Sequence, residues 1–443
     1  MFKEANSSIE WDQSINEEDV KWLISLQKKY SFLPCCRNLE NMLLRPVILD
    51  QVAYQQMQNV AANAIRITVE VFKKTYTDAK ALAKENGIDS RLMDFFTDSL
   101  NSNLWTLMMA RPDIIIDKNG NIKVIELNIE PSIGGLVDCT VLPDEYINGP
   151  SGNKVIKKTQ LRFDRPLVEM AAMLRNLWGS LGNNSTPNVA LIEYQYDVLV
   201  NQLQAEILSG MGVSTSYVRP WELNIKAGEH GLYYGNKLID IAIRNFPLDV
   251  PSSDEEILSL NTLLKSYQDK HAFHLPGDAT SIIANKKSFA LVWEHIEFLS
   301  MSDQLFVKNH IPYTKLLTKK TLERHEAFGN KDLWVLKKSI GHGGKDVLIG
   351  KDAASDKLWN QILNERASSR EYVMQNFIEP SQVVLPFVKQ GCLYKQKVDI
   401  IFGQYVFGDR AGGTLVRFKN SDAGGAINVS RGTGACFCLI KAS

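Results

Sequence analysis

The chain lacks an excess of charge of either sign. Among its 443 residues, lysine and arginine total 50, aspartate and glutamate total 50, and the formal net charge is +0. Without a net field the chain has no general attraction to nucleic acid or to an anionic membrane, and we expect neither as a partner. A local phosphate site is compatible with this balance.

Long apolar runs and zinc-type cysteine pairs are lacking too. The chain has no stretch of about 18 uncharged apolar residues, and its opening segment, MFKEANSSIEWDQSINEEDV, contains no apolar signal core. The six cysteines include no C-x-x-C pair, which zinc or thioredoxin-type chemistry would need. We therefore expect a reduced, cytoplasmic protein. Cys139 is expected to be a small buried side chain, with a reactive thiol as the alternative.

The residues that are present indicate several structural units. A chain of this length is predicted to form about two to four domains. Residues 1–110 are expected to be largely helical, because apolar residues recur there at three-to-four spacing. The period then changes, and DIIIDKNGNIKVIELNI is predicted to be a β-hairpin with Asn119 and Gly120 in its turn.

The rest of the chain alternates between strands and helices. We expect a loop at 142–153 and a helix at about 165–181. Strand and helix patterns then alternate from Val189 to near Ala284, which indicates a parallel sheet in a separate α/β unit. The last third resumes the alternation and ends in strands. The chain has no internal repeat and no low-complexity segment.

The second hairpin strand, IKVIELN, carries two polar residues within an apolar run. Glu126 and Asn128 are two positions apart, so they point to the same side of a strand about 7 Å apart. A shared cation would explain the pair. The alternative is an edge strand whose polar face meets water.

A second motif combines lysines with glycines. The strand WVLKK ends in Lys337 and Lys338 and is followed by the turn SIGHGGKD, which leads into another strand. Glycines let backbone N–H groups approach an anion, and a lysine supplies a charge for phosphate. The turn is no Walker A loop, because Lys345 is followed by Asp346 and by no helix. The pattern fits either a phosphate-covering flap or a purely structural glycine hairpin.

Six features together resemble the ATP-grasp ligases. They are the strand of Lys337, the glycine-rich flap, EYVMQNFIEP, GGTLVRF, INVSRG and the E-x-N strand. The family pattern also has an aspartate a dozen or so residues before E-x-N, and Asp113 meets it. The E-x-N strand ordinarily follows the lysine and the flap, but here it precedes them. This order resembles the circularly permuted group, which includes the synthetase domain of glutathionylspermidine synthase. The resemblance extends from about Asn103 to the C-terminus.

The resemblance implies a fold and a domain plan. The fold would be α/β (α+β), a circularly permuted ATP-grasp fold with an inserted Rossmann-like pre-ATP-grasp domain and a helical N-terminal region. Residues 1–187 would hold the N-terminal helices and the metal-binding hairpin, and 188–284 the pre-ATP-grasp domain. Residues 285–443 would form the nucleotide-binding subdomains, with a tail that pairs with the hairpin at 113–130.

The resemblance also implies site residues. The magnesium ligands would be Asp113, Glu126 and Asn128. ATP would be held by a lysine at the start of a helix, Lys286 or its neighbour Lys287, and by the strand lysine, Lys337. The flap glycines Gly341, Gly343 and Gly344 would cover its phosphates. The hinge that follows a strand would hold the adenine through Gln375, Asn376, Phe377 and Ile378, and Glu379 would bind the ribose.

Three further residues are candidates for the reacting end. Arg417 resembles the arginine that steadies the γ-phosphate and an acyl phosphate, and Asn428 would lie beside it. Arg244 ends an apolar run, where a charge needs a partner. It either pairs with a carboxylate such as Asp240 or meets an anionic substrate. His342 in the flap is expected to be a loop residue and not a base.

The activity implied by the resemblance is ligation. ATP and Mg²⁺ would activate a carboxylate as an acyl phosphate, an amine would attack it, and ADP and phosphate would leave. Small-molecule carboxylate and amine substrates, such as amino acids, are the expected partners. The alternatives are a ligase that loads a carboxylate onto a carrier-protein thiol and a non-catalytic nucleotide-binding module.

Overall fold

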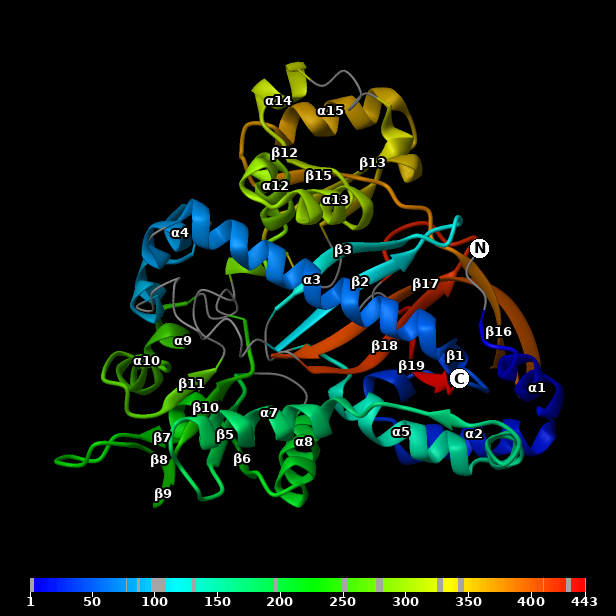
Figure 1. The fold of residues 1–443 in the computed structure, drawn as a ribbon, viewed down its shortest axis with the longest axis horizontal. Helices are drawn as coiled ribbons and strands as arrows, with labels where there is room; N and C mark the ends of the chain where they lie inside the picture. The colour runs from blue at the N-terminus through cyan, green and yellow to red at the C-terminus, as the bar shows by residue number, and fades with distance from the viewer. Residues whose placement is uncertain are drawn as a thin grey trace.

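The structure is a computed structural model that describes residues 4–76, 78–85, 88–96, 109–129, 133–194, 198–247, 253–275, 282–324, 330–341, 346–408, 410–427 and 432–442. Within these ranges it is a mixed α/β protein in which helices pack around several β-sheets (Figure 1). This confirms the expected class.

The largest sheet joins strands from distant parts of the chain. Its order is β1-β19-β18-β17-β2-β3, with β16 paired to β17 and β4 to β19. The strands are β1 (Val47–Asp50), β2 (Met109–Ile116), β3 (Ile122–Asn128), β4 (Leu161–Arg162), β16 (Gln382–Lys389), β17 (Cys392–Phe407), β18 (Arg410–Asn420) and β19 (Gly434–Lys441). The predicted hairpin is present as β2 and β3, and β2 pairs antiparallel with β17.

One face of this sheet is mostly apolar and is covered by α3 (Gln51–Thr75) (Figure 1), and its buried polar pair, Gln404 and Thr414, is bonded to itself. Ile114, Phe402 and Val416 come from three neighbouring strands, and each is at most 1% exposed. Tyr54, also buried, belongs to the same apolar cluster. Burial of this kind is the main favourable term in folding.

The opposite face is divided along the strands. One part lies under α5 (Leu136–Asn148) and α7 (Pro166–Ser180), and its side chains, such as Tyr405 and Leu415, are buried and apolar or aromatic. Further along the same strands the side chains become charged. Because side chains alternate along a strand, the charged positions lie on the face opposite α3.

The N-terminal region is helical with one unpredicted strand. Its helices are α1 (Ser7–Ser14), α2 (Glu17–Lys29), α3, α4 (Ala79–Glu85) and the 3-10 helices η1 (Pro34–Cys36), η2 (Leu39–Asn41) and η3 (Ser90–Phe95). Strand β1 interrupts the helices because its apolar residues pair in parallel with β19. Met109 and Ala110, expected to be helical, begin β2, where pairing with β17 decides their conformation.

The expectation of a loop at 142–153 is wrong. Helix α5 runs to Asn148, and α6 (Pro150–Ile156) follows it. Pro143 and Gly149 suggested a loop. However, Leu142 and Tyr146 are buried, and the Tyr146 ring packs edge-on against Phe437 at 5.2 Å. Tertiary packing here outweighs local propensity. The helix expected at about 165–181 is present as α7.

The parallel sheet expected after Val189 is present. Its order is β11-β10-β5-β6, and all its pairs are parallel. This part contains β5 (Asn188–Ile192), α8 (Val198–Gly210), β6 (Ser214–Val218), η5 (Pro220–Glu222), β7 (Leu223–Asn224), β8 (Leu232–Tyr234), β9 (Lys237–Ile239), β10 (Ile241–Arg244), α9 (Asp254–Leu258), α10 (Asn261–Gln268) and β11 (Phe273–Leu275).

A four-stranded antiparallel sheet, β12-β15-β13-β14, stands beside the β2–β3 hairpin (Figure 1). Its part of the chain contains α12 (Lys287–Glu294), η6 (Ile296–Phe298), α13 (Met301–His310), β12 (Thr314–Leu316), α14 (Lys319–Arg324), η8 (Lys331–Leu333), β13 (Trp334–Lys338), β14 (Val347–Ile349), η9 (Gly350–Asp352), α15 (Asp356–Arg366) and β15 (Tyr372–Asn376). The domain bounds given above stay a prediction.

Two expectations concern the whole chain. Among the described helices, none has the length and apolar character to cross a bilayer. All six cysteines are free, and Cys139 is 2% exposed. Burial raises the pKa of the Cys139 thiol well above its usual value, which favours the buried, unreactive interpretation.

Candidate functional site

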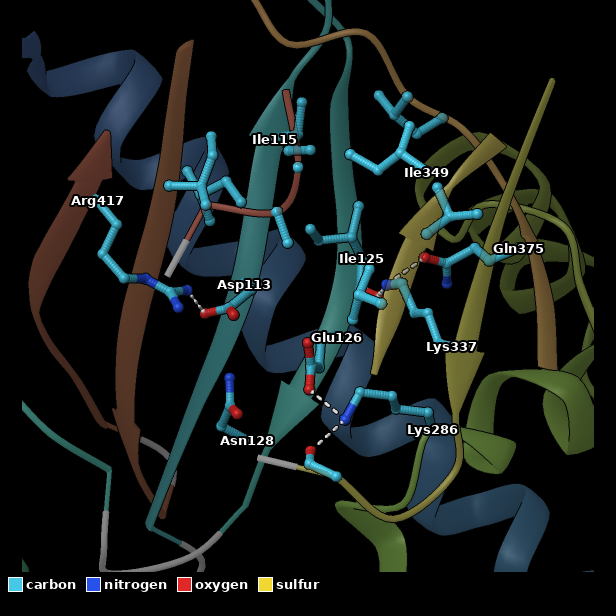
Figure 2. Close-up of a pocket in the computed structure, with 18 of the residues that line it drawn as sticks. Asp113, Ile115, Ile125, Glu126, Asn128, Lys286, Lys337, Ile349, Gln375 and Arg417 are labelled. Carbon is cyan, nitrogen blue, oxygen red and sulfur yellow. Dashed lines mark hydrogen bonds and ion pairs between the residues drawn. The ribbon is translucent and has the colours of Figure 1, made fainter. Parts of the chain in front are cut away.

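A cavity of about 540 Å³ lies between the charged part of the large sheet and the sheet formed by β12 to β15 (Figure 2). Most of the predicted site residues line it. They are Asp113, Glu126, Asn128, Lys286, Lys337, Gly341, Gln375, Asn376, Phe377, Ile378 and Arg417. Gly343, Gly344 and Asn428, with His342, lie outside the described residues.

The three predicted metal ligands lie together on the hairpin. Asp113 of β2 is paired directly with Glu126 of β3, and Arg111 is paired with Asn128. Directly opposed residues have Cβ atoms about 5 Å apart, so the carboxylates share one small region. The Asn128 amide Nδ2 donates to the backbone oxygen of Arg111 at 3.1 Å. This bond uses the amide nitrogen of Asn128 and not its side-chain oxygen. Strand β3 is the edge strand of the sheet, as in the alternative interpretation, but its polar side chains Glu126 and Asn128 line the cavity.

The donor set fits a hard cation. Two carboxylates and an amide oxygen are the ligands that Mg²⁺ prefers, and Mg²⁺ is usually held by one or two carboxylates together with substrate phosphates. Across the described ranges, no group of three or more His, Cys, Asp or Glu side chains forms a self-sufficient metal site. A cation here would therefore need oxygens from another molecule.

Lys286 faces the carboxylates from the other wall (Figure 2). It precedes α12, and its Nζ lies 3.0 Å from Glu126 Oε1 and 2.9 Å from the Gly341 oxygen. Burial alone would raise the pKa of Glu126, but Lys286 and Lys337 outweigh burial and hold the pKa at about 2. Lys287, the alternative, is not among the described lining residues.

Lys337 joins the two walls. Its Nζ donates to the Ile125 backbone oxygen of β3 at 3.0 Å and to Gln375 Oε1 at 2.7 Å. Gln375 is itself fixed by a bond from Nε2 to Thr314 Oγ1 at 3.1 Å. Burial lowers the pKa of Lys337 to about 8, although Glu126 acts in the opposite direction. The lysine is only 6% exposed, so it is a buried positive charge at the cavity.

Arg417 comes from β18 and forms an ion pair with Asp113 (Figure 2). Both side chains are 6% exposed. Burial opposes the charge on Arg417, but Asp113 outweighs burial and raises the pKa of the guanidinium. A permanently charged planar donor thus lies beside the carboxylate pair.

Arg111 is a cavity residue that the sequence reading missed. Two positions before Asp113, it points to the same face, its Nε lies 3.7 Å from Asp113 Oδ1, and its Nη1 donates to the Gly134 oxygen at 2.8 Å. Its side chain crosses β17 at Gly403, where a Cβ atom would lie 2.7 Å from the Arg111 Cδ. Gly403 therefore makes room for the arginine.

An apolar slot lies at the other end of the cavity. Ile115, Ile401 and Ile427 form a small buried cluster, against which Ile125 and Ile378 pack. The predicted hinge borders it, with the Phe377 N–H donating to the Leu333 oxygen at 2.8 Å. A flat apolar ring would fit between such side chains better than a charged group would.

A second missed group closes the slot. Residues 421–427 line the cavity, and the Gly425 N–H donates to Asp352 Oδ2 at 2.7 Å. Lys419 Nζ donates to the Gly425 oxygen, and burial lowers the pKa of this lysine. Lys351 lies 4.3 Å from the centre of the Phe377 ring. The hinge at 375–378, the 3-10 helix η9 and the loop at 421–427 thus contact one another.

Two predicted residues lie elsewhere. Arg244 ends β10, is 6% exposed and donates to the Phe246 oxygen, and it is not among the described lining residues. Asp240, its suggested partner, accepts from the Asn188 N–H at 2.7 Å. Glu379 is also absent from the described lining and pairs with Lys118 at 3.0 Å. Residues next to both positions do line the cavity, namely Ile378 and Pro380 beside Glu379 and Pro247 three positions after Arg244, so the roles of these two stay predictions.

Comparison with known proteins rests on structure. No family model matches the sequence, and no curated protein matches it. Among solved structures, the apo form of a glutathione synthetase-like effector from Globodera pallida is similar, with a TM-score of 0.60 and 10% identity over 96% of this chain and 97% of that chain. The chain has a glutathione synthetase-like fold. At this identity the similarity describes the fold alone.

Two of the residues that sequence analysis did not identify had a recognisable signal. Arg111 and Lys419 each stand two positions from a predicted site residue on a strand, and i and i+2 side chains share a face. Their positions on β2 and β18 therefore place both side chains on the same face as Asp113 and Arg417. Asp352 had no such signal, because only the contact with Gly425 brings it to the cavity.

Proposed function

We propose that the protein is an ATP-dependent carboxylate–amine ligase that forms an amide through an acyl phosphate and releases ADP and phosphate. The observation that carries the proposal is one cavity in which Asp113, Glu126 and Asn128 face Lys286, Lys337 and Arg417. A glutathione synthetase-like fold supports a ligase of the ATP-grasp type.

We infer that the fold is a circularly permuted ATP-grasp fold. The hairpin at residues 109–128 pairs with β17, although some 270 residues separate them in the chain, which is the arrangement that permutation would produce. The parallel sheet between them supports an inserted Rossmann-like domain, and the N-terminal helices complete the plan.

The nucleotide is proposed to lie between the two walls. Its adenine would enter the slot near Ile115, Ile401 and the hinge at 375–378, and its phosphates would meet Lys286 and Lys337. Lysine is a point charge for phosphate, and the buried position of Lys337 strengthens the interaction. Gly341, with Gly343 and Gly344, would cover the phosphates.

The reacting end is proposed to lie at the carboxylates. Asp113, Glu126 and Asn128 would hold Mg²⁺, which when bound supplies positive charge against the repulsion between phosphate and substrate carboxylate. Arg417 and Arg111 would hold the oxygens of the transferred phosphoryl group, because fixed planar donors cost no reorganisation during the reaction. Asn428 is proposed beside Arg417, and Arg244 at the substrate end.

Product analysis tests the reaction. Purified protein with ATP, Mg²⁺ and panels of carboxylates and amines should release ADP and phosphate, and one oxygen of an ¹⁸O-labelled carboxylate should appear in the phosphate. Label in AMP, with pyrophosphate release, would overturn the proposal because the carboxylate would then attack the α-phosphate.

The same assay separates the alternatives. A ligase for a carrier thiol would show ADP release only when a phosphopantetheinyl carrier is the acceptor. A non-catalytic module would bind ATP without turnover across the panel. We also propose a cytoplasmic location, which the six free thiols support.

A further inference from the structure

The two acidic residues proposed as metal ligands are both paired with cations of the same chain. Glu126 Oε1 lies 3.0 Å from Lys286 Nζ, and Asp113 forms an ion pair with Arg417. The donors that would attract a metal are therefore already neutralised. This pairing is a property of the cavity that its proposed chemistry does not require.

Lys286 is held in this position from three sides. Its ammonium bonds to Glu126 and to the Gly341 oxygen, and its backbone N–H donates to the Ser339 oxygen at 3.1 Å. The side chain is 10% exposed. Ser339 and Gly341 begin the glycine-rich flap, so Lys286 ties the flap to strand β3.

We propose that Lys286 is an internal counter-ion of the metal site, so that a divalent cation binds only together with a nucleotide. The inference rests on the proposed function, because it assumes that nucleotide and cation share this cavity. Lys286 would exchange Glu126 for a phosphate group when the nucleotide arrives, and Glu126 would then become free to ligate.

Electrostatic interactions favour this order of binding. A cation that arrives alone must displace Lys286 and leave two positive groups side by side, which is costly at a site of low exposure. It also finds only two carboxylates, Asp113 and Glu126, since the described residues supply no third acidic, histidine or cysteine ligand there. A nucleotide removes both difficulties, because its phosphates pair with the lysine and add oxygen ligands.

The test uses Mn²⁺ as a spectroscopic probe in place of Mg²⁺. Electron paramagnetic resonance counts free Mn²⁺ in titrations of the full-length protein, with and without saturating ADP, and the Mn²⁺ that ADP binds in a matched protein-free titration is subtracted. For wild type we expect at least a tenfold tighter Mn²⁺ affinity with ADP than without it.

Substitution of the counter-ion should change the two affinities in opposite directions. Lys286→Met should bind Mn²⁺ at least about fivefold more tightly than wild type without nucleotide, and ADP more weakly. Lys286→Gln, which keeps a donor for the Gly341 oxygen, should behave in the same way and serves if the methionine variant folds poorly. The control is Lys29→Met, which removes an exposed partner of Glu145 and should match wild type.

The outcomes are distinct. Equal Mn²⁺ affinity of wild type with and without ADP, or unchanged nucleotide-free affinity in both Lys286 variants, would overturn the inference without contradicting the proposed function. A wild type that binds no ADP in isothermal titration would overturn the proposed function as well. A Glu126→Gln variant that still binds Mn²⁺ with ADP as wild type does would show that the metal lies elsewhere.

Discussion

The two faces of the large sheet are built from the same strands but have different roles. On β2, Ile114 faces α3 and is fully buried among apolar side chains, whereas its neighbour Asp113 faces the cavity and pairs with Arg417. The same alternation separates Phe402 from Ile401 on β17. Because one strand carries both kinds of residue, the apolar face fixes the position of the charged one.

The two faces contribute differently to the free energy of unfolding. Buried charges such as Asp113, Arg417 and Lys337 contribute little net stability, because desolvation offsets much of their attraction. Burial of apolar surface against α3 stabilises the same strands. Near neutral pH, substitutions on the α3 face should therefore act mainly on stability, and substitutions on the cavity face should act mainly on binding and turnover.

The largest effect is expected on the α3 face. Phe402→Ala removes a side chain that is 1% exposed, and it should lower the free energy of unfolding by about 3–5 kcal/mol. Urea unfolding measures the loss, and nucleotide binding should persist where the variant remains folded. The control Phe298→Ala, at a side chain that is 43% exposed, should cost less than about 1 kcal/mol. Similar losses in the two variants would contradict the prediction.

Glu126→Gln on the cavity face should act on turnover. It removes a charged oxygen donor and should slow ADP release by about 100- to 1,000-fold in a folded protein. Steady-state kinetics with an accepted substrate pair measures this. The matched control is Glu145→Gln at the exposed pair with Lys29, which should retain wild-type turnover. Wild-type turnover in the Glu126 variant would show that the acid plays no part in the reaction.

The same carboxylate should give the cavity face a pH dependence. The pKa of Glu126 is lowered from 4.5 to about 2, so its stabilising contribution is complete above about pH 4.5 and is lost as the pH falls toward 2. The difference in unfolding free energy between wild type and Glu126→Gln should therefore be smaller at pH 3 than at pH 6, by at most about 3 kcal/mol. An identical difference at both pH values, measured in urea, would refute this.

The smallest effect is expected at Glu379, outside the cavity wall. Its contact with Lys118 is more than half exposed on both sides, so Glu379→Gln should change stability by less than about 1 kcal/mol. Since Glu379 has this other partner, we expect the Kd for ATP to change less than about threefold. Isothermal titration measures it, and a tenfold weakening would contradict this expectation and support the ribose role that the family resemblance implies.

Local pattern predicted the parts of the fold that depend on neighbouring residues. The hairpin around Asn119, the strand of Lys337 and the parallel alternation after Val189 all have short-range signals, and all are present. Strand β1 and helix α5 had none. The first depends on pairing with β19, and the second on packing of Tyr146 against Phe437.

The site residues also divide into those with a local sequence signal and those that depend on distant contacts. Asp113, Glu126 and Asn128 were recognisable from spacing and family pattern, and the hairpin register brings them together. Arg111 lies across Gly403, and Asp352 reaches residue 425 from another segment. The first contact is set by register between strands that are far apart in sequence and the second by the meeting of a 3-10 helix with a loop, and no local pattern encodes either.

The pairing of β2 with β17 has a consequence for how the molecule forms. Residues 109–116 can pair with β3 at once, but their second partner, β17, forms only after residues 392–407 have been synthesised, and β1 must wait for residues 434–441. Contacts of such long sequence separation slow folding. The parallel sheet from β5 to β11 has nearer partners and can form earlier. On the ribosome, then, the part of the apolar face of α3 that packs on β17 stays uncovered while most of the chain emerges, which makes this helix a natural site for chaperone contact and for aggregation during synthesis.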